Sequence, residues 1–171
     1  MTLKPANYKY RRTNGTSLTG GKEMGYIYAE LELTNEDDLA YYRRGDLPCE
    51  KIQKVTCRAL VDSGAWDLVI NQDVQSRLNL PFIGREAVSL ADETWLDVDI
   101  VGPVNVRFED HFTIVRAVIL PGISEVLLGA YPLQGLDAFI DAKGERLLVH
   151  PDSPYNPKSY IRQVKQISLS V

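Results

Sequence analysis

A single carboxylate stands where a strand of apolar residues should end. In ALVDSGAWDLVI, residues 59–70, Asp62 lies between Val61 and Ser63, and the residues after Ser63, Gly64 and Ala65, are small. Burial of a lone carboxylate costs several kcal/mol unless the group is paired, protonated or hydrated. Two interpretations therefore fit. Asp-Ser-Gly is a common turn sequence, or Asp62 is a reactive group whose small neighbours leave room beside it.

Other arrangements that carry chemistry have little support in this sequence. It contains no Gly-rich phosphate loop, no His-Glu-x-x-His and no Gly-x-Ser-x-Gly. The histidines are His111 and His150, and nothing further supports a Ser-His-Asp triad through Ser63. Asp97 and Asp99 alternate with apolar residues, so both fall on one face of a strand, which we interpret as its solvated face.

The overall composition is that of an ordinary globular protein. The 171 residues, 44% hydrophobic and 25% charged, suit one domain with a real core. A net charge of −4 argues against general nucleic-acid binding. No apolar run is long enough for a spanning helix, and the basic N-terminal stretch lacks the apolar core of a secretory signal. Cys49 and Cys57 make neither a disulfide framework nor a four-ligand metal site, and we expect reduced thiols of a cytoplasmic protein, although a single Cys49–Cys57 link stays open.

The pattern of apolar and turn-forming residues predicts mostly strands. Many short strands at regular spacing, with two short helices, predict a small β-barrel. Residues 34–48 are charged and rich in turn formers, so we expect an exposed loop or hairpin tip there. We expect turns at 92–93, 102–103 and 109–111, and a helix whose first turn contains Pro132. The strands are expected at 26–33, 53–61, 67–70, 86–91, 94–101, 104–108 and 112–120, the other helix at 71–80, and a hairpin at 139–150.

Two segments together resemble a known family. ALVDSGAWDLVI resembles the active-site segment of the retropepsin-like aspartic proteases: two hydrophobic residues, Asp, Thr or Ser, Gly and Ala. Further along, EVLLGAYPLQGLDAFID resembles the second signature of that family, in which apolar residues and a Gly open a short helix. Between them, REAVSLADETWLDVDIVGPVNV occupies the place of the flap hairpin and its return strand. The order and spacing match over residues 26–150, with the closest likeness to single-domain bacterial members.

The resemblance implies an all-β fold, a closed retropepsin-like acid-protease barrel with one lobe per chain and one or two short helices. The expected domains are a flexible basic N-terminal lead at 1–25, the protease domain at 26–150, and a C-terminal tail at 151–171 that is a candidate dimer-interface strand.

The resemblance also implies an aspartic endopeptidase. Such chemistry needs two carboxylates about 3 Å apart that share one proton. Because Asp-Ser/Thr-Gly occurs once, the second carboxylate is expected from a homodimer, with Asp62 of each subunit meeting on a two-fold axis and activating a water. The expected partners are a second copy and a peptide or protein substrate, without a cofactor, metal, nucleic acid or membrane.

The resemblance assigns roles to neighbouring residues. The Ser63 hydroxyl would bond to the partner's backbone, and Gly64 would lend a carbonyl to substrate. Trp66 is expected at a substrate-contacting position, or alternatively as an aromatic residue packed in the barrel. The catalytic segment is Asp62, Ser63 and Gly64; the expected substrate contacts are Ala65, Trp66, Asp67, Ala91, Asp92 and Glu93; and the expected support is Leu127, Leu128 and Gly129.

Two departures from the family pattern leave a second function open. The expected flap tip, residues 91–94, contains no Gly, and Ala130 replaces the Arg or Asn that often follows the second Gly in viral members. The alternative is a retropepsin-fold dimerisation or peptide-binding module with little or no proteolytic activity. The acidic flap tip and the unusual 34–48 segment also favour that alternative.

Overall fold

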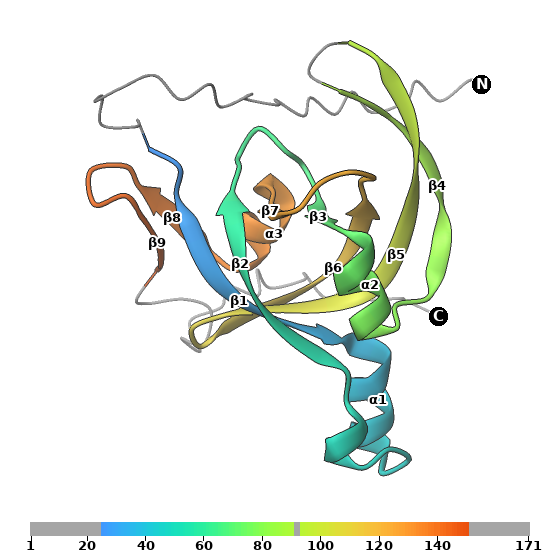
Figure 1. Cartoon of the computed structure of the whole chain (residues 1–171). Coiled ribbons are helices and arrows are strands. Elements are labelled where there is room, and N and C mark those ends of the chain that lie inside the picture. Colours follow the sequence, from blue (N-terminus) through green and yellow to red (C-terminus); the bar gives the residue numbers. More distant parts are fainter. Residues whose placement is uncertain (1–24, 91–92, 151–171) are drawn as a thin grey trace, which may run out of the picture.

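The fold is a closed β-barrel, as the sequence predicts. The computed structural model describes residues 25–90 and 93–150. Within these residues, six strands form a ring in the order β1-β2-β7-β3-β6-β5, and a pairing of β1 with β5 closes it (Figure 1). The ring strands are β1 (Tyr28–Asn35), β2 (Lys54–Val61), β3 (Leu68–Ile70), β5 (Trp95–Phe108), β6 (His111–Ile119) and β7 (Val126–Leu128).

The barrel interior is filled by apolar side chains from every strand of the ring. On β1, for example, Leu31 and Leu33 are fully enclosed while Glu30 and Glu32 face outward, because successive residues of a strand point to opposite faces. The same alternation places Val104 and Val106 of β5 inside. Residues 62–67 are called the Asp62 segment below. The packed interior fixes the register of the two strands, β2 and β3, that flank this segment.

A long hairpin extends from the barrel. Its strands are β4 (Phe82–Ser89), which pairs with β5 outside the ring, and the first half of β5. The turn predicted at 102–103 is wrong: β5 continues through Gly102 and Pro103, where the β5–β6 pairing shifts at a bulge. A bulge tolerates proline because a residue there need not donate to the ladder. In Figure 1 the hairpin curves up beside the barrel, and the β2–β3 loop lies at the same upper end.

The prediction of a loop at 34–48 is also wrong, because this segment contains helix α1 (Glu36–Arg44). The Asn35 side chain caps the helix by accepting from the backbone N–H groups of Asp37 and Asp38. Acidic residues in the first turn and basic residues in the last complement the helix dipole, and Gly45 ends the helix in a left-handed conformation. A single 3₁₀ turn, Cys49–Lys51, follows before β2. In Figure 1, α1 lies at the end of the barrel away from the β2–β3 loop.

The remaining elements agree with the sequence. Helix α2 (Gln72–Leu78) begins after Asn71, whose side chain accepts from the Val74 N–H, and the short helix α3 (Ala130–Gly135) contains Pro132 near its start. Strands β8 (Ala138–Asp141) and β9 (Arg146–Val149) form the expected hairpin.

Several expectations concern other parts of the chain. The basic lead falls almost entirely, and the C-terminal tail wholly, outside the described residues. Among the described residues, none of the helices has the length and apolar character needed to cross a membrane. Cys49 and Cys57 are both free thiols.

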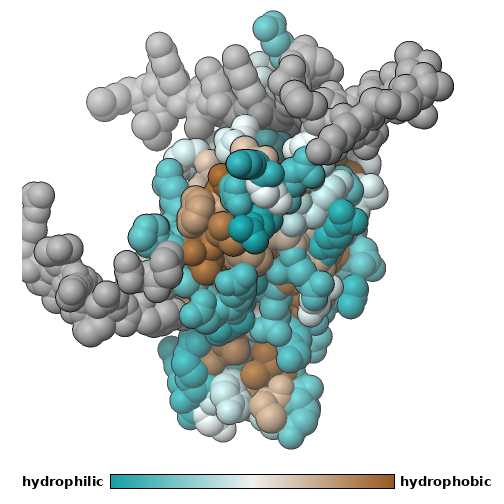
Figure 2. All heavy atoms as spheres, turned by 90° about the vertical axis from the view of Figure 1, so that its left-hand side faces the viewer, coloured by the Kyte–Doolittle hydropathy of each residue, from teal (hydrophilic) through white to brown (hydrophobic). Residues whose placement is uncertain are grey.

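The face of the molecule on the left of Figure 1 carries apolar surface among polar side chains (Figure 2).

Candidate active site

The Asp62 segment is held by a strand that pairs with both of its ends. β2 leads into the segment and β3 leads out of it, and β7 lies between them, parallel to β2 and antiparallel to β3. The Asp62 N–H donates to the Leu128 carbonyl at 3.0 Å, which continues the β2–β7 ladder by one step. The backbone of Asp62 is therefore positioned by sheet hydrogen bonding rather than by a free loop.

The Asp62 side chain sits in a turn and is also accessible. Its Oδ1 accepts from the Gly64 N–H at 2.9 Å, and its carbonyl accepts from the Ala65 N–H at 3.1 Å. A Cβ on Gly64 would lie 3.0 Å from that Oδ1, so glycine leaves the carboxylate its room. Asp62 is half-buried, Ser63 and Gly64 are exposed, and no described cation lies within 4.0 Å of the carboxylate. The turn interpretation of Asp-Ser-Gly is therefore confirmed, and the reactivity of Asp62 stays a prediction with which its partial exposure is compatible.

Gly129 lets the chain pack directly behind the segment. A Cβ at this position would lie 2.3 Å from the Asp67 carbonyl oxygen and 2.7 Å from the carbonyl carbon of Trp66, which leaves no space for a side chain. Just beyond it, the Ala130 N–H donates to the Ala65 carbonyl at 2.8 Å, and the Tyr131 N–H donates to the Trp66 carbonyl at 2.9 Å. The start of α3 is therefore fixed to the segment by two hydrogen bonds.

The other residues of the predicted support are strand residues. Leu128 is fully buried in the barrel interior, and Leu127 is half-buried on the opposite face of β7. Ala65 is buried against the same cluster as Leu127. The expected supporting residues are thus all next to the Asp62 segment.

Asp67 is enclosed and ion-paired. Its side chain is 2% exposed, and its two oxygens accept from Nε and Nη2 of Arg116 at 3.2 and 3.3 Å. Arg116 also donates to Glu86 on β4, through Nη1 at 2.5 Å and Nη2 at 3.1 Å. Burial raises the pKa of Asp67, and the hydrogen bonds from Arg116 oppose that rise. A direct contact between Asp67 and substrate stays a prediction, and this enclosed geometry does not favour it.

Trp66 lies at the surface instead of inside the barrel. Its side chain is 45% exposed, and its ring stacks on that of Tyr131, with centroids 6.0 Å apart and planes 26° from parallel. Tyr131 is itself 47% exposed. The two rings form an open apolar surface directly beside the Asp62 turn, and a role in substrate contact stays a prediction for Trp66.

A second apolar cluster lies between the Asp62 segment and the long hairpin. Val88 of β4 and Val98 of β5 pack there with Ala65. The half-buried apolar side chains at its edge are Leu90, Leu96, Ile123 and Leu127. The arrangement gives this side of the Asp62 segment a wall of partly accessible apolar groups.

The hairpin tip closes without a glycine. The Leu90 N–H donates to the Thr94 carbonyl at 2.8 Å, and the Glu93 N–H donates to the Leu90 carbonyl at 3.0 Å. Glu93 takes a left-handed conformation with φ 68°, which is uncommon for a residue other than glycine. Two other expected substrate contacts, Ala91 and Asp92, lie outside the described residues.

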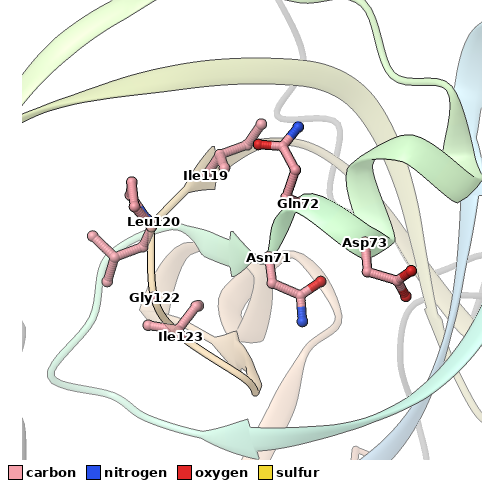
Figure 3. A pocket seen from close by; sticks show the side chains of 8 residues that line it. Asn71, Gln72, Asp73, Ile119, Leu120, Gly122 and Ile123 are labelled. Atoms are coloured by element: carbon pink, nitrogen blue, oxygen red, sulfur yellow. The ribbon is translucent and has the colours of Figure 1, made fainter.

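A surface hollow of about 460 Å³ lies near the site but not at Asp62. Figure 3 shows Asn71, Gln72 and Asp73 on one side of it, and the chain from Ile119 to Ile123 on the other. The Asn71 side chain donates to the Ser124 carbonyl at 3.2 Å and so ties the two sides together. The hollow is separate from the apolar wall beside the Asp62 turn, although Ile123 borders both.

Two other kinds of site, a metal centre and a Ser-His-Asp triad with His111, can be compared with the structure. In the described parts of the chain, no three His, Cys, Asp or Glu side chains come together as a metal site. His111 is buried and pairs with Asp110 at 2.8 Å. Arg116 is the β6 residue that contacts Asp67 of the Asp62 segment. His111 lies roughly 16 Å from it along β6, at about 3.3 Å per residue, so His111 gives no support to a triad through Ser63.

Sequence reasoning missed Arg116, Glu86 and Tyr131. The signal for Arg116 was present, since it is the one charge inside the apolar run FTIVRAVIL. Nothing local marked Glu86 or Tyr131 as neighbours of the Asp62 segment, because both come from distant parts of the chain.

A comparison with models of known protein families gives a match. The family model described as aspartyl protease matches residues 50–131, a range that runs from the turn before β2 to the start of α3. It contains the Asp62 turn, the long hairpin and Gly129. A search of the curated proteins found no match.

Proposed function

The matched segment, residues 50–131, belongs to the aspartyl protease family, and from that premise we propose that this protein is a homodimeric aspartic endopeptidase. The proposed catalytic group is a pair of Asp62 carboxylates, one from each copy of the chain. The protein would hydrolyse peptide bonds with a water molecule held between them.

The observation that carries the proposal is the state of Asp62. It is half-buried on a backbone fixed by β7, and no described cation lies within 4.0 Å of it. Of the acidic groups nearby, Asp67 and Glu86 both accept hydrogen bonds from Arg116. One chain thus supports one available carboxylate at this position, and the chemistry needs two. A second copy related by a two-fold axis would supply the other.

The proposed reaction follows from a shared proton. Two carboxylates about 3 Å apart cannot both be ionised, so the pair retains one proton at mildly acid pH. The ionised member takes a proton from water as the water oxygen attacks the peptide carbonyl carbon. The protonated member donates to the carbonyl oxygen as it gains charge. Breakdown of the tetrahedral intermediate breaks the C–N bond, and the amine leaves with a proton.

The surroundings of Asp62 suit a partner and an apolar peptide. Ser63 and Gly64 are exposed at the tip of the turn, where the Ser63 hydroxyl could bond to the partner's backbone. The exposed Trp66–Tyr131 stack adjoins that tip. The half-buried Leu90 and Leu96 of the hairpin and Leu127 of β7 favour apolar side chains next to the scissile bond. The cytoplasmic location expected from the sequence stays a prediction.

The alternative is a peptide-binding or dimerisation module with little proteolysis. The hairpin tip favours it, because Glu93 holds a left-handed conformation where glycine would give a more mobile turn. A structure of the dimer distinguishes the two functions. An endopeptidase requires the two Asp62 carboxylates within about 4 Å and near coplanar, whereas a module does not.

Peptide cleavage at about pH 4 to 6 tests the proposal. The wild type should cleave a mixture of apolar peptides, and Asp62→Asn should not. Asp99→Asn is a matched control, since Asp99 is a partly exposed carboxylate on β5 that pairs with Arg85. Equal cleavage by wild type and Asp62→Asn would contradict the assignment.

A further inference from the structure

Arg116 joins two parts of the site that are far apart in the sequence. From β6 its guanidinium reaches Asp67, which follows the Asp62 turn, and Glu86, which lies on β4 of the long hairpin. Each carboxylate receives two N–H groups from the planar fork. A lysine could not hold two carboxylates in this way, because its charge is a compact point without a rigid fork.

The two arms of this arginine differ in what they need. Asp67 is 2% exposed, so it requires a cation to offset the cost of its burial. Glu86 is 38% exposed and would be well solvated without Arg116. An ion pair of that exposure contributes little to the stability of a fold. Stability alone therefore accounts for the Asp67 arm and leaves the Glu86 arm without an explanation.

The place of Glu86 supplies one. β4 hydrogen-bonds only to β5 among the described strands, and the hairpin they form borders the apolar wall beside Asp62. The backbone pairing of β5 with β6 reaches Asp99, opposite Ile119, and Glu86 lies opposite Val98, just beyond it. There Val88 packs the hairpin onto the cluster, but apolar packing is not directional. The Glu86–Arg116–Asp67 link is directional and connects the hairpin to the segment that carries Asp62.

We propose that Arg116 and Glu86 are positioning residues that fix β4 of the long hairpin relative to the Asp62 segment, and so set the position of the hairpin wall against which a peptide binds. This rests on the proposed function, because it concerns the same site. Neither residue touches the reacting atoms. Their effect is on the binding of the peptide, and it acts through the hairpin.

A second ion pair on the hairpin provides the matched control. Arg85 and Asp99 are 3.0 Å apart and join β4 to β5, with side chains 64% and 43% exposed. This pair lies within the hairpin and does not reach the Asp62 segment. Glu86→Gln and Asp99→Asn each remove one partly exposed carboxylate from the hairpin, but only the first weakens the link to Arg116, by removing the charge and the second acceptor oxygen.

The kinetic test compares these two variants with wild type on one cleaved peptide. Glu86→Gln should raise KM roughly fivefold with kcat nearly unchanged, as expected when binding common to substrate and transition state is lost. Its Tm should stay close to that of wild type, and Asp99→Asn should match wild type in KM. Arg116→Lys keeps a cation for Asp67 but loses the planar fork that also holds Glu86. It should therefore raise KM by a similar factor. Adding Glu86→Gln to Arg116→Lys should then raise KM no further.

Three results would overturn the proposal, and they differ from failure of the proposed function. They are a wild-type KM in Glu86→Gln, an equal rise in Asp99→Asn, or a fall in Tm and kcat together that marks a merely structural role. If wild type cleaves no peptide, the proposed function fails, and hydrogen exchange then decides the positioning role. Amides of β4 should exchange faster in Glu86→Gln than in Asp99→Asn, and equal exchange would overturn the link itself.

Discussion

The carboxylates at the two ends of the Asp62–Asp67 segment have opposite surroundings. At one end, Asp67 is enclosed and receives two hydrogen bonds from Arg116. At the other, Asp62 is half-buried, and among the described residues its side chain accepts only the Gly64 N–H. The backbone is held at both ends, by the hydrogen bond from the Asp62 N–H to the Leu128 carbonyl and by the close packing of Gly129 against the Asp67 carbonyl. The difference separates a carboxylate that is ion-paired inside the fold from one that has no described cation within 4.0 Å and that we propose as the catalytic group.

The largest expected effect separates the two ends by activity. Asp62→Asn should lower kcat about 10³-fold, within the usual range for loss of a general acid or base. Its free energy of unfolding should stay within about 0.5 kcal/mol of wild type, because no described ion pair is lost. Kinetics and urea unfolding on the same preparation measure both. A large loss of stability in Asp62→Asn would remove the contrast between the two carboxylates.

The next effect is on stability and falls on the Asp67 end. Arg116→Met removes the cation and leaves Asp67 buried without compensation, which should lower the free energy of unfolding by about 2–4 kcal/mol. The lower part of that range is expected, since the Arg116 side chain is 34% exposed and water can partly replace it. Urea unfolding at neutral pH measures the loss. Arg85→Met is the control, as its partner Asp99 is much more exposed and should lose little.

That loss should depend on pH in a defined direction. Burial raises the pKa of Asp67, and removal of Arg116 takes away the hydrogen bonds that oppose the rise. In Arg116→Met, folded Asp67 then holds its proton at pH values where the unfolded chain, with a pKa near 3.8, has lost it. Because the folded state binds more protons there, stability of the variant falls as pH rises above that value. Urea unfolding at several pH values should show that the difference in free energy of unfolding between wild type and Arg116→Met becomes smaller toward low pH. A gap that widens toward low pH would contradict this assignment of charge.

The smallest effect concerns the backbone that both ends share. Gly129→Ala forces a Cβ to within 2.3 Å of the Asp67 carbonyl oxygen, so the segment must shift. Overpacking of this kind costs about 1–3 kcal/mol, and cleavage should fall as the Asp62 turn moves. Gly84→Ala is the matched control, since a Cβ there meets nothing within 4 Å. Equal stability of the two variants would mean that Gly129 does not hold the segment.

Local patterns predicted the core of this site. Alternating apolar residues gave the barrel strands, and small residues around Asp62 marked the turn, because both signals lie within a few positions of each other. Local patterns do not predict helix α1 within 34–48, because its charged residues and turn formers act as caps and dipole partners, and without an apolar stripe such residues are typical of a loop. The sequence predicts a turn at Gly102-Pro103 because the bulge that tolerates this pair depends on pairing with β6, which no local pattern shows.

The Arg116 link lay beyond local patterns for a different reason. Its three members come from β4, β6 and the segment before β3, and only the closed barrel brings them together. An arginine within an apolar strand is a visible signal, but no local pattern indicates that it pairs with Asp67 and Glu86.

Mixed dimers test the central claim most directly. Wild type and Asp62→Asn chains, refolded together in varied proportions, should form dimers at random, and a dimer with one Asp62 lacks the pair. Activity should then fall with the square of the wild-type fraction, to about one quarter in an equal mixture. The same series with Asp99→Asn should show no such fall. Activity proportional to the wild-type fraction, about one half in an equal mixture, would show that each chain works alone and would contradict a shared Asp62 pair.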